Sequence, residues 1–188
     1  MMEIEMDKRT ARSIKSKNAL KSAFLELIQA KDPELITVVD LCRKAGLNRS
    51  TFYAHYSYTD DLIREIILDS VKEVYFDLGT QWNLPLDGGG VDRTVISTYI
   101  HRFLNNPTLR RFCTCYNSEK YRTMIIRAQI ELTLGESKDP VRYYTAYFYN
   151  AGVLNFTQEW FSNGMPLQEN HFVEIIHEFS KVMYGLKL

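Results

Sequence analysis

Apolar residues recur every three to four positions along most of the chain, which is the spacing of amphipathic α-helices and leaves no clear strand pattern. Only 9 glycines and 5 prolines interrupt 188 residues, so the regular segments are long. The sequence therefore predicts an all-α fold of about nine helices, with a loop at residues 79–92. The helices are expected at residues 12–30, 38–45, 49–55, 59–78, 91–104, from 107 onward, 117–134, 140–163 and 167–185.

Polar residues at the ends of these segments account for several boundaries. Thr37 stands where it can cap the helix at 38–45, and Asp40 follows three residues later to bond back to the helix start. Gly46 follows the last residue of that helix, as a helix stop should. Four further N-caps are expected, at Asn48, Thr59, Asn106 and Asp139.

Positive charge gathers near the N-terminus although the whole chain has a net charge of zero. From Lys8 to Tyr56 there are ten Lys or Arg residues and four Asp or Glu residues. The 132 residues after Tyr56 hold thirteen basic and sixteen acidic residues. A basic segment on a mildly acidic body is expected when one end of a protein meets phosphate groups.

The two short helices at 38–45 and 49–55, joined by a glycine-containing turn, have the helix-turn-helix arrangement. In that motif the second helix enters the DNA major groove, and its first residues approach the base edges. Arg49 is the best candidate for base reading, because its guanidinium group can pair with guanine. A purely structural helix pair, with its Ser and Thr residues serving only as caps, is the alternative.

Other side chains in this segment are predicted to touch the DNA backbone or to face inward. Tyr53 and His55 can donate to phosphates, and Thr37 at a helix N-terminus can hold another phosphate. Phe52 and Tyr56, four residues apart, are expected to face the protein interior. The predicted DNA-binding set is Thr37, Lys44, Asn48, Arg49, Ser50, Thr51, Tyr53 and His55.

The stretch from Ile36 to Leu62 closely resembles the DNA-binding domain of the TetR/AcrR family. Members typically have an apolar-rich helix that ends in Ala-Gly, then a small polar residue and a Thr-aromatic-Tyr-x-His-aromatic pattern. The residues here in that pattern are Thr51, Phe52, Tyr53, His55 and Tyr56. The resemblance covers roughly residues 10–65. It implies a helix-turn-helix domain at 10–65 and a helical ligand-binding and dimerisation domain at 66–188.

One position departs from the family pattern. Members usually carry a phosphate-binding lysine shortly after the recognition helix, where this chain has Thr59. That backbone contact is expected to be missing, or to be supplied by Lys44 or by Arg12 and Lys17.

The resemblance implies a homodimeric DNA-binding regulator that recognises a palindromic operator. We expect a repressor released by a small-molecule inducer; the alternative is a co-activator of the same fold controlled by a protein partner. Residues 149–176 look like the C-terminal pattern of a subset that includes activators of dihydroxyacetone kinase operons.

Aromatic residues crowd the C-terminal two thirds, where they either line a ligand pocket or simply form the core. The candidate ligand-binding residues are Tyr99, Phe103, Tyr116, Tyr147 and Asn150, with Asn155, Gln158 and Glu159 as further polar contributors. The last two helices are the expected dimer surface, although packing within one chain is the alternative. That surface is predicted to include Ala146, Asn150, Ala151, Gly152, Phe172, Ile175, Ile176, Phe179, Val182 and Met183.

Several function classes are not expected. The three cysteines and four histidines are scattered without metal-ligand spacing, so no metal or cofactor is predicted. The sequence has no phosphate-cradling glycine loop and no nucleophile elbow, so it does not predict an enzyme. It also lacks a signal peptide and an apolar run of about 18 residues, and a soluble cytoplasmic protein is expected.

Overall fold

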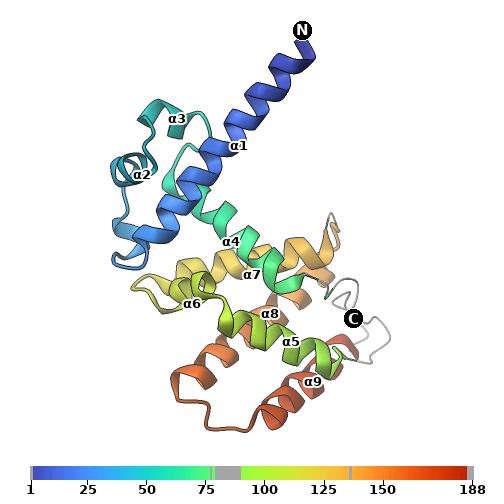
Figure 1. Cartoon of the computed structure of the whole chain (residues 1–188). Helices are drawn as coiled ribbons and strands as arrows, with labels where there is room; N and C mark the ends of the chain where they lie inside the picture. Colours follow the sequence, from blue (N-terminus) through green and yellow to red (C-terminus); the bar gives the residue numbers. More distant parts are fainter. Residues whose placement is uncertain (1, 77, 79–89, 136, 186–188) are drawn as a thin grey trace. The chain divides into compact units, whose positions relative to one another are not determined.

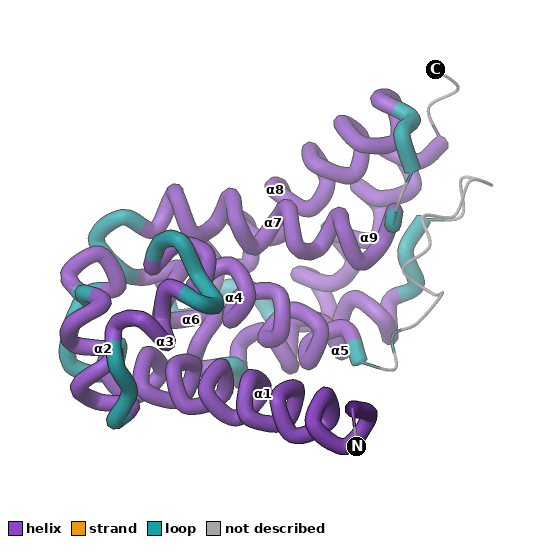
Figure 2. Tube along the Cα trace, turned by 90° about the horizontal axis from the view of Figure 1, so that it is seen from above, coloured by secondary structure: helices purple, strands orange, loops and turns teal. Residues whose placement is uncertain are grey.

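The computed structural model describes residues 2–76, 78, 90–135 and 137–185, with side chains from residue 10 onward. This part of the chain consists of nine α-helices and one short 3-10 helix, without strands (Figures 1 and 2). The helices are α1 (Met2–Leu27), α2 (Val38–Ala45), α3 (Arg49–Tyr53), α4 (Thr59–Tyr75), α5 (Arg93–Asn105), α6 (Pro107–Thr114), α7 (Ser118–Leu134), α8 (Pro140–Ser162) and α9 (Glu169–Gly185), and the 3-10 helix is η1 (Pro33–Leu35). The predicted all-α class is confirmed.

Some boundaries differ from the prediction. α1 begins at Met2 instead of near residue 12, because a polar segment without Gly or Pro can stay helical where it has no apolar face to pack. It ends at Leu27, and η1 was not predicted. α3 and α4 end at Tyr53 and Tyr75, each a few residues before the predicted end. Of the predicted loop, residues 79–89 lie outside the described residues, and 90–92 are not helical.

The predicted caps at Asn106 and Asp139 are confirmed by hydrogen bonds, and the one at Thr59 is wrong. The Asn106 side chain accepts from the Leu109 N–H at 2.9 Å, and that of Asp139 accepts from the Val141 N–H at 2.9 Å. Thr59 is the first residue of α4 rather than its cap. At this helix start the Asp61 carboxylate accepts from the backbone N–H groups of residues 57 and 58, at 3.0 and 2.9 Å.

The contacts divide the chain into two compact units. The N-terminal unit comprises residues 1–66 together with the turn at 115–117, and the C-terminal unit comprises residues 67–114 and 118–188. α4 begins in the first unit and ends in the second.

The N-terminal unit buries one apolar face of each of its helices. Its buried side chains include Leu20, Phe24 and Ile28 near the end of α1, Leu41 and Cys42 on α2, Phe52 on α3, Tyr56, and Leu62, Ile63 and Ile66 on α4. Ile14, earlier on α1, is exposed, since the fully buried part of this helix begins only at Leu20.

The C-terminal unit has an aromatic core. Its largest buried side chains are Tyr99, Phe103, Phe112, Tyr121, Tyr149 and Phe172, from α5 to α9. The Phe172 ring stacks on Phe156 and on Trp160, with ring centroids 4.5 and 4.2 Å apart. The Trp160 indole donates to the Leu167 carbonyl at 3.0 Å, which ties the end of α8 to the segment before α9.

The residues just before α5 are held against α9. The Val91 N–H donates to Ser180 Oγ at 2.8 Å, and the Val91 carbonyl lies 2.7 Å from His177 Nδ1. Gly90 has a φ of 74°, and a Cβ there would lie 2.5 Å from Lys181 Cγ. Only glycine fits at this close approach.

Within the described residues, no helix is both long and apolar enough to cross a membrane. In the same part of the chain, no three side chains of His, Cys, Asp or Glu gather closely enough to hold a metal ion.

Candidate nucleic-acid interface

α2 starts with the predicted capping box. Thr37 Oγ1 accepts from the Asp40 N–H at 3.2 Å, and the Thr37 N–H donates to Asp40 Oδ2 at 3.1 Å. Lys31 Nζ lies 2.8 Å from the same carboxylate oxygen. Hydrogen bonds from Lys31 and then from Thr37 hold the pKa of Asp40 well below its ordinary value. Because the Thr37 hydroxyl also donates to Asp40 at 2.8 Å, it would have to exchange partners to bind a phosphate.

The turn between α2 and α3 matches the sequence pattern. Gly46 ends α2 in the left-handed region, with φ 65° and ψ 33°. Asn48 occupies the N-cap position of α3 with extended backbone, but its side chain makes no capping hydrogen bond. The predicted side-chain cap is therefore wrong at Asn48, and its exposed amide faces solvent instead.

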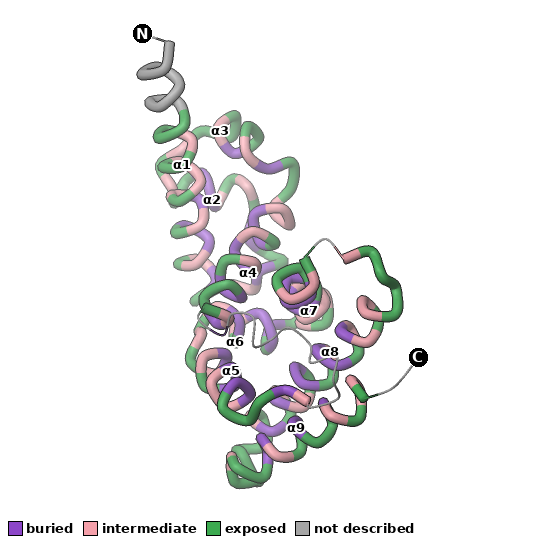
Figure 3. Tube along the Cα trace, turned by 90° about the vertical axis from the view of Figure 1, so that its right-hand side faces the viewer, coloured by how far each residue is buried: buried purple, intermediate pink, exposed green. Residues whose placement is uncertain are grey.

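α3 is anchored by one buried ring and exposes most of its polar side chains. Phe52 is fully buried and packs on the buried Tyr56, with ring centroids 5.7 Å apart, which confirms the predicted inward pair. Arg49, Ser50 and Tyr53 are exposed, and Thr51 is half-buried. Figure 3 shows exposed as well as buried segments along α2 and α3. The exposed side of α3 is thus free to meet a partner.

Arg49 and Tyr53 lie one turn apart on this exposed side. Arg49 Nη2 lies 3.4 Å from Tyr53 Oη, and its guanidinium carbon lies 5.9 Å from the centre of the Tyr53 ring. The contact is long and solvent-exposed, so it orients the guanidinium group weakly without neutralising its charge.

His55 is held to α1 instead of pointing freely to solvent. Its Nε2 lies 2.7 Å from Ser16 Oγ. Ser16 Oγ also lies within hydrogen-bond distance of the Ser13 carbonyl, at 2.9 Å. The contact with Ser16 ties the segment after α3 to α1. A phosphate contact of His55 stays a prediction.

Two of the three cations expected to compensate for Thr59 are engaged within the N-terminal unit. Lys44 Nζ lies 2.6 Å from Glu26 Oε2, and Lys17 Nζ lies 2.9 Å from Glu65 Oε2. Glu65 also receives Lys21, at 2.8 Å. Burial alone would raise the pKa of Glu65, but hydrogen bonds from Lys17, Lys21 and Tyr56 lower it to about 2. Glu65 therefore ties α1 to α4 as a carboxylate.

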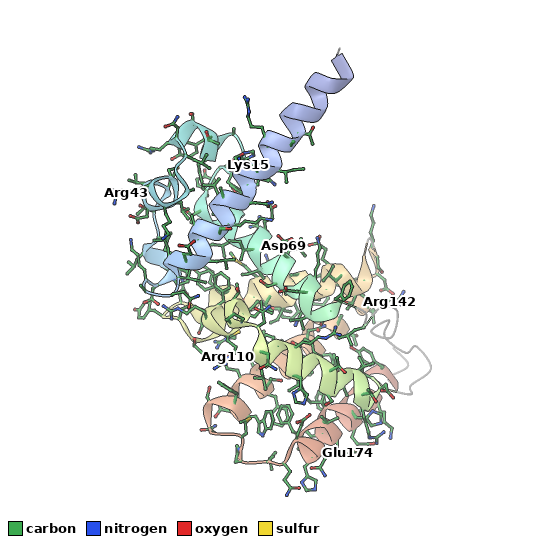
Figure 4. The ribbon with its side chains drawn as sticks, viewed as in Figure 1. Lys15, Arg43, Asp69, Arg110, Arg142 and Glu174 are labelled. Atoms are coloured by element: carbon green, nitrogen blue, oxygen red, sulfur yellow. The ribbon has the colours of Figure 1, made fainter. Side chains whose placement is uncertain are left out.

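The described part of the N-terminal unit also contains cations that do not pair with a described carboxylate. Of nine Lys and Arg side chains described in this unit, five pair with carboxylates: Lys17, Lys21, Lys31, Lys44 and Arg64. The other four form no ion pair with any described residue and are exposed: Arg12, Lys15, Arg43 and Arg49. Figure 4 labels Lys15 on α1 and Arg43 on α2. Neither was in the predicted DNA-binding set, because a sequence does not reveal which cations find carboxylate partners.

The predicted ligand-binding residues do not form one group. Tyr99, Phe103 and Asn150 are buried in the C-terminal unit, and Tyr147 is half-buried. Tyr116 is 94% exposed and belongs to the N-terminal unit, so its assignment to an enclosed pocket is wrong.

The further polar candidates form hydrogen bonds within the C-terminal unit. The amide groups of Asn155 and Gln158 donate to the carbonyls of Ala151 and Cys113, at 2.8 and 2.6 Å. The Glu159 carboxylate accepts from Asn163 at 2.8 Å. These contacts stabilise α8 and its surroundings and leave a ligand role for the three residues untested.

The predicted dimer face divides into core and surface. Phe172, Ile176, Ala146 and Asn150 are buried within the C-terminal unit, so assigning them to a contact between chains is wrong. Ile175, Phe179 and Val182 are exposed, as is Gly152, whereas Ala151 and Met183 are half-buried. The prediction missed Tyr144 and Phe148 on α8, which are also exposed. An apolar groove of about 200 Å³ runs along these helices, lined by Tyr149, Gly152, Val153, Phe156, Ile175, Ile176 and Phe179.

Comparison with solved structures identifies the fold. The crystal structure of a TetR transcriptional regulator from Rhodococcus sp. RHA1 matches 94% of this chain and 99% of its own, with a TM-score of 0.57 and 13% identity. This chain has the TetR-regulator fold. The predicted resemblance is thereby confirmed at the level of the fold, including its helix-turn-helix segment.

Two further comparisons carry less weight. The dihydroxyacetone kinase operon activator DhaS matches 90% of this chain and 96% of its own at 15% identity, with a TM-score of 0.48. At that score the predicted likeness to its subset stays a prediction. The uncharacterised HTH-type transcriptional regulator YxbF of Bacillus subtilis (strain 168) is 36% identical over 73 residues, which is 38% of this chain but 18% of YxbF. The match thus spans less than a fifth of that relative. No protein-family model matches the chain.

Proposed function

We propose that this protein is a DNA-binding transcriptional regulator that reads its site with α3. The proposal rests on one observation, which is that α3 is anchored by a buried ring and exposes its polar side chains. Phe52 fixes the helix from inside, while Arg49 presents an uncompensated charge to solvent beside Ser50 and Tyr53. A short helix that is rigidly held and positively charged on its open side is suited to the major groove.

The side chains divide by the part of DNA they would meet. Arg49 would pair with a guanine, and the free amide of Asn48 and the hydroxyls of Ser50 and Thr51 would reach bases or nearby phosphates. Tyr53 would donate to a phosphate. Thr37 and Lys44 would join only by exchanging their contacts with Asp40 and Glu26.

A homodimer would bring two recognition helices to a palindromic operator. The support is the apolar surface of α8 and α9, where Phe148 and Phe179 stack with centroids 6.4 Å apart and both remain exposed. Val182 and Tyr144 extend this surface, with 63% and 70% of their area exposed. Exposed apolar patches of this kind mark interfaces in water-soluble folds. Sedimentation of Phe179→Glu against the unchanged protein tests the dimer, and the variant should be monomeric.

We further propose a repressor that a small-molecule inducer releases from DNA, in the cytoplasm where its operator would lie. The support is a buried polar region in the C-terminal unit, around Tyr99 and Asn150. Gln129 donates to Tyr99 Oη at 2.7 Å, but Gln129 Oε1 finds no hydrogen-bond partner among the described residues. The same holds for Tyr184 Oη. Buried polar atoms without partners are uncommon and suit a polar guest.

The alternative is a co-activator that a protein partner controls. A thermal-shift screen of small neutral hydroxyl and carbonyl compounds separates the two, because an inducer that binds the folded state raises the melting temperature. A hit that also dissociates the protein from DNA would favour the repressor.

The DNA proposal itself is tested by selecting bound duplexes from fragmented genomic DNA and measuring their affinity by fluorescence anisotropy. Arg49→Ala should lose discrimination at one base pair, worth roughly 1–3 kcal/mol. Tyr53→Ala should weaken all sequences alike. Lys72→Gln, an exposed charge on the α4 segment of the C-terminal unit, is the matched control. If the unchanged protein binds no duplex at low salt, the proposal is wrong.

A further inference from the structure

We propose that α1 carries a second DNA-contact site, in which Arg12 and Lys15 bind phosphate groups that flank the base pairs read by α3. The inference rests on the proposed function, because it assumes that α3 binds DNA. It adds a contact outside the helix-turn-helix segment, made by side chains whose chemistry suits a phosphodiester backbone rather than base edges.

The first support is the contact that joins α1 to the end of α3. Ser16 Oγ lies 2.7 Å from His55 Nε2, and His55 lies two residues beyond the last residue of α3. Residues three and four apart on a helix share one side of it. Arg12 therefore lies on the same side of α1 as Ser16, one turn nearer the N-terminus. Lys15, three residues after Arg12, shares the side of Arg12 but not that of Ser16. The Ser16–His55 contact places this turn of α1 beside the segment that follows α3.

The second support is charge. Arg12 and Lys15 are both exposed, and neither forms an ion pair with any residue that the structure describes. The cations that follow on α1, Lys17 and Lys21, are neutralised by Glu65. From residue 10 to residue 25 α1 contains no acidic residue. Its carboxylate at Glu26 pairs with Lys44.

An anion bound beside Arg12 and Lys15 would relieve their mutual repulsion. Two like charges three residues apart destabilise a helix, and the helix offers no carboxylate between them. DNA phosphates would supply the missing negative charge. The Arg12 guanidinium group can bond two phosphate oxygens at once, whereas the Lys15 ammonium group acts as a point charge. Such contacts add affinity and position the protein, but they do not read sequence.

The decisive variant is Arg12→Gln/Lys15→Gln. The control removes the same charge elsewhere, through Lys72→Gln/Lys138→Gln, both exposed residues of the C-terminal unit. Affinity is measured by fluorescence anisotropy on the selected duplex and on a random duplex, each at several salt concentrations. Each lost phosphate contact reduces the magnitude of the slope of log affinity against log salt by about 0.9. The slope of the double variant should therefore be smaller in magnitude than that of the unchanged protein by about 2. Its affinity should fall about equally on both duplexes, by roughly tenfold or more at low salt.

A shortened duplex locates the contact. When the base pairs flanking the selected site are removed, the unchanged protein should bind as weakly as the double variant does. Arg12→Lys/Lys15→Arg retains both charges and should keep most of the affinity. It also keeps the test decisive if the glutamine variant fails to fold, since the flank dependence can then be measured on charge-retaining protein.

The possible failures are distinguishable. If the unchanged protein binds no duplex, the proposed function is wrong. If it binds but the glutamine variant keeps both its affinity and its salt slope, then α3 reads DNA and the α1 charges are only solvated. A loss confined to the selected duplex would also overturn the inference, because phosphate contacts cannot distinguish sequences.

Discussion

The two compact units use polar side chains in opposite ways. The N-terminal unit displays them, since Arg12, Lys15, Asn48, Arg49 and Tyr53 are all exposed. The C-terminal unit buries them, since Tyr99, Gln129, Asn150, Thr157 and Ser180 have little or no exposed area. We infer that the first unit can change these exposed side chains without losing its fold, whereas the buried polar groups of the second contribute to its stability.

The buried tyrosines show how the second unit tolerates polar groups. Burial raises the pKa of Tyr75, Tyr99, Tyr149 and Tyr184 well above the ordinary value for tyrosine. These hydroxyls therefore stay neutral throughout the physiological pH range. They act as hydrogen-bonding groups inside an apolar surrounding, where each lost partner is costly.

The contrast between exposed and buried side chains is tested most strongly within α3 itself. Phe52→Ala should lower the free energy of unfolding of the protein by about 3–5 kcal/mol, because it empties a fully buried aromatic site. Tyr53→Ala, on the next residue of the same helix, should change it by less than about 1 kcal/mol. Urea denaturation followed by circular dichroism measures both. Similar losses for the two variants would mean that the exposed side of α3 is also structural.

A second test removes one buried hydroxyl from the C-terminal unit. Tyr99→Phe should cost about 1–3 kcal/mol of unfolding free energy, because the amide group of Gln129 loses the acceptor that lies 2.7 Å away. Tyr53→Phe is the matched control on the N-terminal unit and should be neutral. Adding Gln129→Leu to Tyr99→Phe should cost less than the sum of the single changes. Additive costs would show that the two side chains are not coupled.

The ion cluster at Glu65 is the exception in the N-terminal unit, because its polar contacts do contribute to stability. The folded pKa of Glu65, about 2, lies below the ordinary 4.5, so the unfolded state binds its proton first as pH falls. This contribution is fully present above pH 4.5 and disappears as pH falls toward 2. We expect Glu65 to contribute roughly 1–3 kcal/mol to the free energy of unfolding, because solvent screening at its 28% exposed carboxylate reduces the effect.

Unfolding of the unchanged protein and of Glu65→Gln, measured between pH 7 and pH 2.5, isolates this contribution. The variant should be less stable at pH 7, and the difference should shrink as pH falls. A difference that is constant across this range would show that Glu65 packs without titrating.

The smallest expected effect concerns Lys44. Glu26→Gln would release Lys44 from its partner 2.6 Å away and should tighten DNA binding, by less than about threefold. The unfolding free energy should stay within about 0.5 kcal/mol of the unchanged protein. Anisotropy at low salt measures the gain, with Glu34→Gln, an exposed acid outside the helix-turn-helix pair, as the control. Weaker binding would mean that the pair holds α2 in its reading position.

Local sequence determined most of the helices and the inward or outward direction of their side chains. The capping box of Thr37 and Asp40, the glycine stop at Gly46 and the Asn106 cap lie within four residues of the groups they bond. Spacing alone likewise predicted that Phe52 and Tyr56 would face inward. Short-range rules work here because each such interaction is complete within about one turn of helix.

Only the tertiary structure decided which of these residues remain available to a partner. Lys17 and Glu65, His55 and Ser16, and Lys44 and Glu26 are far apart in sequence, and folding brings each pair together. Among the described side chains of the N-terminal unit, Arg12, Lys15, Arg43 and Arg49 are left without an ion pair. A charge that is neutralised by a distant residue looks the same in sequence as one that is free. The sequence thus predicted a basic helix-turn-helix module, while the fold determined which of its cations pair with carboxylates.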